Sequence, residues 1–316
     1  DTLIKIKKFF PNFKIYSIKS GTKVFDWTIP SEWNIIDAYL LDKNKKKIIN
    51  FSKNNLHVVG YSRPINKTFT KTQILKKIYS LPGKPNAIPY ITSYYKKDWG
   101  FCANNKIKNI IKKKYLNSDK FKAVIKSSFK KNGVLNYGEL YIPGKSKQEI
   151  LISTYICHPS MANNELSGPI VSMSLMEFFK KNRKKLNKSI RFVFIPETIG
   201  ALTFLSKNLV KLKKNFIAGY NLTCLGDERM YSCMLSKYGD SVSDSSLISA
   251  FKRKKIKFKI FSFLKRGSDE RQYNSPGIDL PVTSFFRSKY HEYPEYHTSL
   301  DDFKIVTKKG VFGSYN

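Results

Sequence analysis

Histidine and carboxylate side chains gather in a few short polar segments of this 316-residue sequence. Two of the four histidines, His158 and His297, lie in such segments, and Glu197 lies in another. Each segment comes after a run of apolar residues that predicts a β-strand. Imidazole and carboxylate groups transfer protons and bind metal ions, so these three residues are the first candidates for chemistry.

Other catalytic motifs fail on their spacing. Cys157 and His158 are neighbours on an extended segment, where consecutive side chains point to opposite faces. The run over residues 138–146 is one residue too long for a phosphate-binding loop. Residues 291–297 lack the helical spacing of a metalloprotease helix, and Pro294 interrupts them. The sequence contains no Gly-x-Ser-x-Gly nucleophile elbow.

The candidate residues require an α/β sheet to bring them together. Four apolar runs predict its strands: residues 150–156, 190–195, 216–222 and 281–286. The first two runs are apolar enough to be buried on both faces, as central strands are. A helix is predicted over residues 168–181, with Pro169 in its first turn. Ligands bind beyond the carboxyl ends of such strands, so the polar residues there are expected to line one pocket.

The N-terminal third of the chain has a different pattern. Residues 25–120 contain short aromatic and alternating runs broken by turn residues, which predict a small strand-rich inserted module. Apolar spacing predicts one helix in it, over residues 71–79. We therefore expect residues 1–24 to form the N-terminal part of the larger domain and residues 121–316 to form the rest of it.

Four long segments can be compared with known families: Tyr155–Pro169, Ile195–Gly200, Gly267–Tyr273 and Tyr293–Asp301. Together they resemble an uncharacterised bacterial aminopeptidase-like domain family. The resemblance implies a zinc-exopeptidase-like fold, of the phosphorylase/hydrolase-like type, whose sheet is flanked by helices. Members carry an inserted module of unknown function, which the stretch from Phe25 to Cys102 resembles.

The same resemblance assigns roles to the three candidates. His158 and His297 match metal ligands, and Glu197 matches the carboxylate that takes a proton from the attacking water. Simpler roles remain open for all three. The histidines could be hydrogen-bonded loop residues, and Glu197 could be a buried structural acceptor.

Three positions depart from the family pattern. Asn164 stands where the family has the metal-bridging aspartate, and Thr198 stands where it has the second glutamate of a Glu-Glu pair. Thr223 aligns with an aspartate that follows the third strand. Two zinc ions need several anionic ligands, so we expect one Zn²⁺ held by His158, His297 and Asn164. The sequence does not determine the third ligand, and Glu165 and Asp269 are alternatives to Asn164.

Four further residues are candidates for substrate binding: Glu270, Arg271, Arg287 and Tyr296. Arg271 or Arg287 could hold a substrate carboxylate through paired donors. Equally, the two arginines could neutralise the acidic pair at residues 301–302. Residues 269–271 could form an internal ion-pair cluster that holds their loop.

The composition points away from nucleic acid. The net charge is +35, but lysines spread along the whole chain together with many Asn, Ile, Phe and Tyr, as in proteins from AT-rich genomes. No nucleic-acid-binding motif accompanies them. The lysine-rich run over residues 43–47 is expected on solvated surface. The four cysteines lack paired metal-ligand spacing, and no apolar run could span a membrane, so the prediction is a cytoplasmic protein.

The sequence therefore predicts a metal-dependent hydrolase of an amide bond, acting as an aminopeptidase or as a deacylase of a small molecule. The expected partner is a small-molecule or peptide substrate. The alternative is a peptidase-like protein in polysaccharide biosynthesis that has lost catalysis and kept a binding role. A general polyanion binder is the third hypothesis, and its affinity would collapse with salt.

Overall fold

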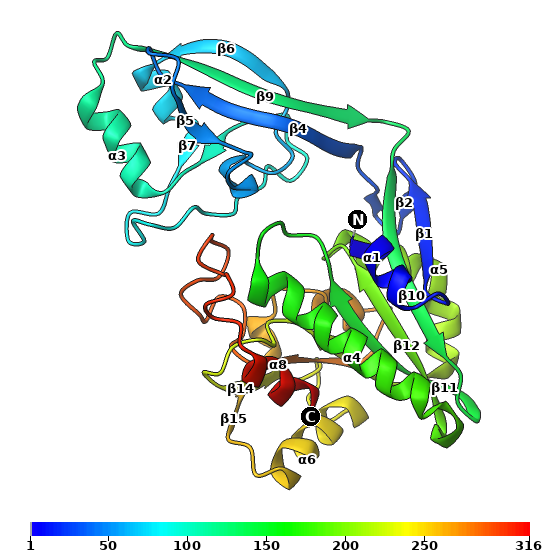
Figure 1. Ribbon diagram of the computed structural model, residues 1–316. Helices are drawn as coiled ribbons and strands as arrows, with labels where there is room; N and C mark the ends of the chain where they lie inside the picture. Colours follow the sequence, from blue (N-terminus) through cyan, green and yellow to red (C-terminus); the bar gives the residue numbers. More distant parts are fainter. Residues whose placement is uncertain (1) are drawn as a thin grey trace.

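An eight-stranded mixed sheet forms the larger part of the molecule in the computed structural model, which describes residues 2–316 (Figure 1). Its strands, in spatial order, are β1 (Lys14–Lys19), β10 (Val134–Ile142), β12 (Lys188–Ile195), β11 (Ser146–Tyr155), β13 (Phe216–Leu222), β16 (Val282–Phe286), β14 (Tyr231–Met234) and β15 (Phe258–Phe261).

The four strands predicted from apolar runs lie at the centre of this sheet. β12, β11, β13 and β16 are all parallel to one another. On either side the sheet turns antiparallel, where β10 pairs with β12 and β14 pairs with β16. The α/β prediction is confirmed, with a run of four parallel strands at the centre and a further parallel pair, β14 with β15, at one edge.

Helices cover both faces because side chains alternate along the central strands. On one face, Phe192 and Phe194 of β12 pack against Met176 of α4 (Ser167–Lys181). On the other face, Val193 packs with Phe204 of α5 (Ile199–Asn215). The predicted helix over residues 168–181 is therefore present as α4. Three more helices complete this part: α6 (Val242–Arg253), α7 (Glu270–Tyr273) and α8 (Lys308–Tyr315).

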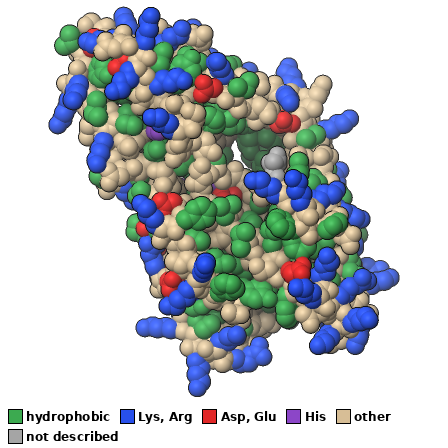
Figure 2. Space-filling model, viewed as in Figure 1, with side chains coloured by type: hydrophobic (Ala, Val, Ile, Leu, Met, Phe, Trp, Pro, Cys, Tyr) green, Lys and Arg blue, Asp and Glu red, His purple; other side chains and the backbone are tan. Residues whose placement is uncertain are grey.

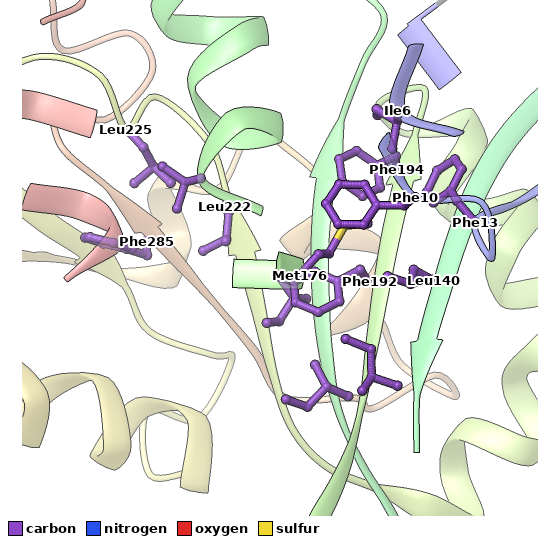
Figure 3. Packing of buried hydrophobic residues seen from close by; sticks show 14 of the residues in the cluster. Ile6, Phe10, Phe13, Leu140, Met176, Phe192, Phe194, Leu222, Leu225 and Phe285 are labelled. Atoms are coloured by element: carbon purple, nitrogen blue, oxygen red, sulfur yellow. The ribbon is translucent and has the colours of Figure 1, made fainter. Parts of the chain in front are cut away.

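The N-terminal segment joins the same core. α1 (Thr2–Phe9) leads into β1, which pairs antiparallel with β10 at the edge of the sheet. Figure 3 shows Ile6, Phe10 and Phe13 packed around Phe194, and the Phe13 and Phe194 rings meet edge to face at 5.5 Å. A hairpin of β2 (Lys23–Val24) and β3 (Trp27–Thr28) then leads out of the large sheet.

The inserted module has its own four-stranded antiparallel sheet, in the order β5 (Lys47–Asn50), β4 (Glu32–Leu41), β9 (Lys120–Lys130) and β6 (Ile65–Thr70). Two helices, α2 (Lys71–Leu75) and α3 (Asn105–Lys114), and the strand pair β7 (Ile78–Tyr79) with β8 (Phe101–Cys102) complete it.

Two sequence expectations for this module need correction. Because β9 pairs with β4 and β6, the module's sheet extends to Lys130, past the boundary expected at residue 120. The helix expected over residues 71–79 ends at Leu75, where the chain turns to place Ile78 in a strand of the buried core. Local apolar spacing could not distinguish a helix of two turns from a short helix followed by a strand.

Lysine and arginine side chains stand over both parts of the molecule without forming one patch on the visible face (Figure 2). The lysines at positions 43 and 45–47 are exposed at the turn between β4 and β5, as predicted. Within residues 2–316, no helix is both long and apolar enough to cross a lipid bilayer.

Candidate active site

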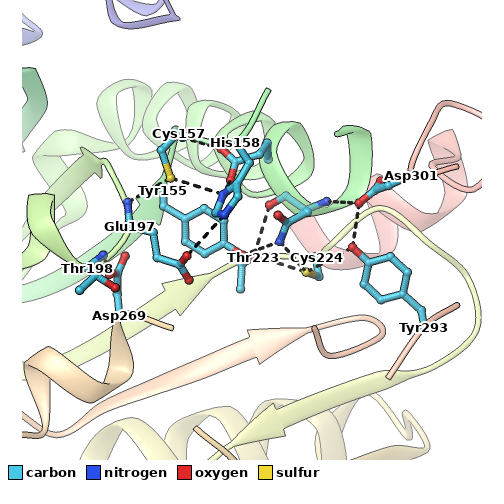
Figure 4. A network of polar contacts seen from close by, with 12 residues as sticks. Tyr155, Cys157, His158, Glu197, Thr198, Thr223, Cys224, Asp269, Tyr293 and Asp301 are labelled. Atoms are coloured by element: carbon cyan, nitrogen blue, oxygen red, sulfur yellow. Dashed lines mark hydrogen bonds and ion pairs between the residues drawn. The ribbon is translucent and has the colours of Figure 1, made fainter. Parts of the chain in front are cut away.

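The three first candidates converge beyond the carboxyl ends of the central strands. His158 follows β11, Glu197 follows β12, and His297 lies in the long segment after β16. The centroids of the two imidazole rings are 4.9 Å apart. Nε2 of His158 lies 3.7 Å from Oε2 of Glu197 (Figure 4). The parallel strands thus bring together residues that are far apart in the sequence.

Glu165 fixes the His158 ring. One carboxylate oxygen of Glu165 hydrogen-bonds to Nδ1 of His158, and the other accepts from the backbone N–H of Cys157 at 2.6 Å. Burial opposes a charge on His158, but Cys157 and the Glu165 carboxylate together raise its pKa well above the ordinary value. A carboxylate behind one ring nitrogen leaves the other to face the pocket, which is the arrangement found behind histidine ligands of metals.

His297 is half-buried, and its imidazole is neutral. Burial, followed by the nearby His158 and His291, lowers its pKa to about 3. Its Nε2 atom is buried and has no hydrogen-bond partner among residues 2–316. The stacked ring of Tyr296, 3.8 Å away, covers one face of the imidazole. Neutral imidazole with a free nitrogen is the form in which histidine binds metal ions.

Two of the positions that depart from the family pattern, Asn164 and Thr223, donate hydrogen bonds to the same hydroxyl group. Tyr155 OH accepts from Nδ2 of Asn164 at 2.7 Å and from Oγ1 of Thr223 at 2.5 Å. Asp301 accepts the backbone N–H groups of Asn163 and Asn164 and so fixes this segment. The Oδ1 atom of Asn164 remains buried without a hydrogen-bond partner among the described residues. A neutral hydrogen-bond network therefore occupies positions where the family pattern has carboxylates.

Glu197 is the accessible carboxylate of the site. Its side chain is 21% exposed, whereas that of His158 is 6% exposed. Burial raises the pKa of Glu197, and the positive charge of His158 opposes that rise. Asp269 lies behind it, and burial together with Glu197 raises the pKa of Asp269 well above the ordinary value. One oxygen of Asp269 accepts the backbone N–H of Thr198 at 2.7 Å, and the other has no partner within residues 2–316.

Comparison with known proteins shows the family of the chain. A model of a domain of unknown function, DUF4910, matches residues 1–316. The chain belongs to that family. A Clostridium acetobutylicum protein, described as a polysaccharide biosynthesis protein with an aminopeptidase-like domain, is 43% identical over 317 residues, which are 99% of this chain and 70% of that protein.

Solved structures show the same relationship. A crystal structure named as a peptidase from Clostridium acetobutylicum matches with a TM-score of 0.93 at 41% identity, over 99% of this chain and 72% of that one. The zinc aminopeptidase BSAP from Bacillus subtilis matches with a TM-score of 0.69 at 14% identity, over 99% of this chain and 85% of that one. The resemblance to an aminopeptidase-like family is thereby confirmed, and the fold is that of the zinc aminopeptidases.

The four candidates for substrate binding fall into different places. Tyr296 lies against His297 at the site. Arg271 is half-buried near Glu197 of the site, and its Nη2 donates to Oγ1 of Thr198, the next residue along the chain, at 3.0 Å. Glu270 is fully buried, and Gly267, Ser268 and Tyr290 donate hydrogen bonds to its carboxylate, which makes it an internal anchor of its loop.

Arg287 does not join the other candidates. Its guanidinium lies over the ring of Tyr231, 3.7 Å from the centroid, in a pocket on β14 and β15. The expectation that Arg287 neutralises Asp301 is also wrong, because Asp301 accepts hydrogen bonds from Tyr293 and from two backbone amides. Sequence order placed Arg287 just after β16, but it could not show on which side of the sheet the side chain lies.

Tyr90 of the inserted module is a site residue that sequence analysis missed. Its ring meets the His158 ring at 4.8 Å and the His297 ring at 5.1 Å, both edge to face. Its backbone N–H donates to the carbonyl of His297 at 2.8 Å, and Pro89 forms a β-bridge with Thr298. The module therefore forms one wall of the candidate site. The available signal was the run Ile88–Ile91, which we interpreted only as a strand.

We expect Tyr90→Ala to loosen this wall. Loss of the half-buried ring should lower the free energy of unfolding by about 1–3 kcal/mol and increase proteolytic cleavage between the module and the larger domain. Tyr90→Phe is the matched control and should behave as wild type, because no hydrogen bond of the Tyr90 hydroxyl is seen within residues 2–316. Urea unfolding and limited trypsin digestion measure the two effects. Equal unfolding midpoints for the Ala variant and wild type would rule out this wall as a stabilising contact.

Proposed function

We propose that this protein is a hydrolase of amide bonds that uses one zinc ion, held by His158 and His297. One observation carries the proposal. Nε2 of His297 and Oδ1 of Asn164 are both buried without partners, in a site where His158 also directs a ring nitrogen toward Glu197. Buried polar atoms are normally satisfied, so unpaired acceptors in one site favour a missing cation.

The residues present fit one zinc ion and do not fit two. Two imidazoles on one tetrahedral zinc, with bonds of about 2.0–2.1 Å, place their ring centroids roughly 5 Å apart. The separation of 4.9 Å agrees with that value. A second ion would need the carboxylates that Asn164, Thr198 and Thr223 replace. Asn164 and Thr223 instead donate hydrogen bonds to Tyr155 OH.

The chemistry divides between the ion and Glu197. A bound zinc would polarise the scissile carbonyl and make water acidic enough to be ionised near neutral pH. Glu197 is positioned to accept the proton from the attacking water and then to donate it to the leaving amine. Burial raises the pKa of Glu197, which suits a group that must do both. Arg271, held by Thr198, is placed to orient an anionic end of the substrate.

The metal content of the protein tests this proposal. Protein purified without chelators should contain about one zinc per chain. His297→Ala should lose most of it, because a catalytic zinc needs three protein ligands. His57→Ala is a matched control, since His57 is a buried histidine of the module whose Nδ1 lies 2.7 Å from the Cys102 carbonyl. Elemental analysis and hydrolysis of aminoacyl-4-nitroanilides give the two measurements. Zinc content unchanged in His297→Ala would contradict the proposal.

A second candidate function is a binding protein without catalysis in polysaccharide biosynthesis. The hydrogen bonds that Asn164 and Thr223 donate to Tyr155 OH favour it, because they engage side chains at positions where a second metal would need carboxylate ligands. The Clostridium acetobutylicum relative is described as a polysaccharide biosynthesis protein. Protein that takes up no zinc and hydrolyses no amide after zinc addition would favour this function.

A further inference from the structure

A second pocket lies on the far edge of the large sheet, beside β14 and β15. Its volume is about 550 Å³, which is within the range of small-ligand sites. Tyr231, Phe258 and Ile256 give it aromatic and aliphatic walls, and Lys257 and Arg287 contribute positive charge. None of its lining residues belongs to the site of His158 and His297, so the pocket does not depend on the proposed function.

Arg287 is a buried cation without a protein partner. The residue is 5% exposed, and its Nε atom is buried with no hydrogen-bond partner among residues 2–316. Glu295 pairs with Arg229 at 2.8 Å. Glu228, which also lines the pocket, accepts a hydrogen bond from Thr307 and pairs with Lys309 at 3.1 Å; these two contacts, followed by the more distant charge of Arg287, lower the pKa of its carboxyl. Glu228 forms no ion pair with Arg287 among the described residues. An unpaired buried charge is costly, so such an arginine favours an anionic ligand.

The fold holds this guanidinium ready for a ligand. It stacks on the Tyr231 ring at 3.7 Å. Gly313 of α8 approaches both side chains so closely that a Cβ atom there would lie 3.0 Å from Nη1 of Arg287 and 2.4 Å from the Tyr231 hydroxyl, and a larger residue would have to displace these side-chain ends. A side chain fixed in this way loses little freedom on binding.

The charges and walls of the pocket indicate the ligand class. Arg287 is buried without a partner, and Lys257 is exposed at the rim, where it makes no ion pair with any described residue. Two cations that form no ion pair among the described residues match a phosphate monoester, which carries about −1.5 to −2 charges near neutral pH. We propose that this pocket binds a small phosphorylated metabolite, with its phosphate on Arg287 and Lys257 and its apolar or planar part against Phe258.

Calorimetric titration of the full 316-residue chain with phenyl phosphate tests the proposal. Phenyl phosphate combines a dianionic phosphate with a planar ring, and it should bind more tightly than inorganic phosphate. Arg287→Lys should weaken its binding by about tenfold, because lysine cannot make the paired contacts of a guanidinium. Lys257→Gln, at an exposed position, should weaken binding by about threefold without affecting the fold.

Two comparisons make the test decisive. Arg183→Gln, a change at an exposed arginine outside the pocket, should leave binding unchanged. Benzoate should bind more weakly than phenyl phosphate. The proposal is overturned if phenyl phosphate gives no heat up to about 10 mM, or if the Lys257 and Arg287 variants both bind it as wild type does. Benzoate binding as tight as that of phenyl phosphate would instead identify a carboxylate site and overturn the phosphate assignment.

Discussion

Glu197→Gln should reduce amide hydrolysis by about 10³-fold or more while the protein keeps its zinc. General acid–base catalysis contributes about 10²–10⁴-fold, and the amide of glutamine cannot accept a proton from water. Oε2 of Glu197 is 3.7 Å from Nε2 of His158, so the carboxylate lies beside the histidine but too far from Nε2 for a hydrogen bond. Steady-state kinetics together with zinc analysis of the same samples measure both properties.

Glu177→Gln is the matched control for this substitution. Glu177 is an exposed glutamate of α4 that pairs with Lys181 one helical turn away, and its loss should leave both rate and zinc unchanged. Glu197→Gln with wild-type kcat would show that Glu197 is only a structural acceptor. Loss of zinc in Glu197→Gln would instead make Glu197 a ligand and would remove it as the base.

The pH dependence of hydrolysis gives an independent check on Glu197. Burial raises the pKa of Glu197, and a general base is active only when deprotonated. The value of kcat/KM should therefore fall as the pH drops through this raised pKa, at a pH above the ordinary range of glutamate. If kcat/KM falls only within the ordinary pKa range of glutamate, Glu197 is not buried in the working enzyme.

The sequence predicted the convergence of the site better than the roles of its members. Strand order and the family motifs were sufficient to bring His158, Glu197 and His297 to one end of the sheet, because parallel strands end at the same edge. The contacts of Tyr155 and Tyr90 could not be predicted in this way. Tyr155 acts through a hydroxyl shared by two distant segments, and Tyr90 arrives from another folding unit.

For the fold, strong local patterns were reliable and boundaries were not. The central strands contain long apolar runs, and α4 carries Pro169 in its first turn as predicted. β9 was assigned to the larger domain, although its residues belong to the sheet of the inserted module. Only its pairing with β4 and β6 shows to which sheet it belongs, and pairing partners are not encoded locally.

Arg191 is a buried charged residue in a strand that was predicted from its apolar residues. It lies in β12, in a run that we predicted to be buried on both faces, and its side chain is only 2% exposed. Its guanidinium donates to Glu149 of β11 at 2.9 and 2.8 Å and to Glu139 of β10 at 2.6 Å. One cation thus joins three neighbouring strands, and two buried carboxylates depend on it.

Arg191→Met should lower the free energy of unfolding by about 3–5 kcal/mol, because it leaves Glu139 and Glu149 buried without their counter-ion. Urea unfolding at neutral pH measures this loss, which is a large part of the roughly 5–15 kcal/mol that stabilises a typical protein. Arg229→Met, which breaks the more exposed pair with Glu295, is the control and should cost less than about 1 kcal/mol.

The cause of the expected loss can be separated from simple damage to packing. In a triple variant, Arg191→Met with Glu139→Gln and Glu149→Gln, no buried charge remains, so much of the lost stability should return. A deficit that stays the same in the triple variant would mean that Arg191 acts through its packing alone, and that the three strands do not depend on its charge.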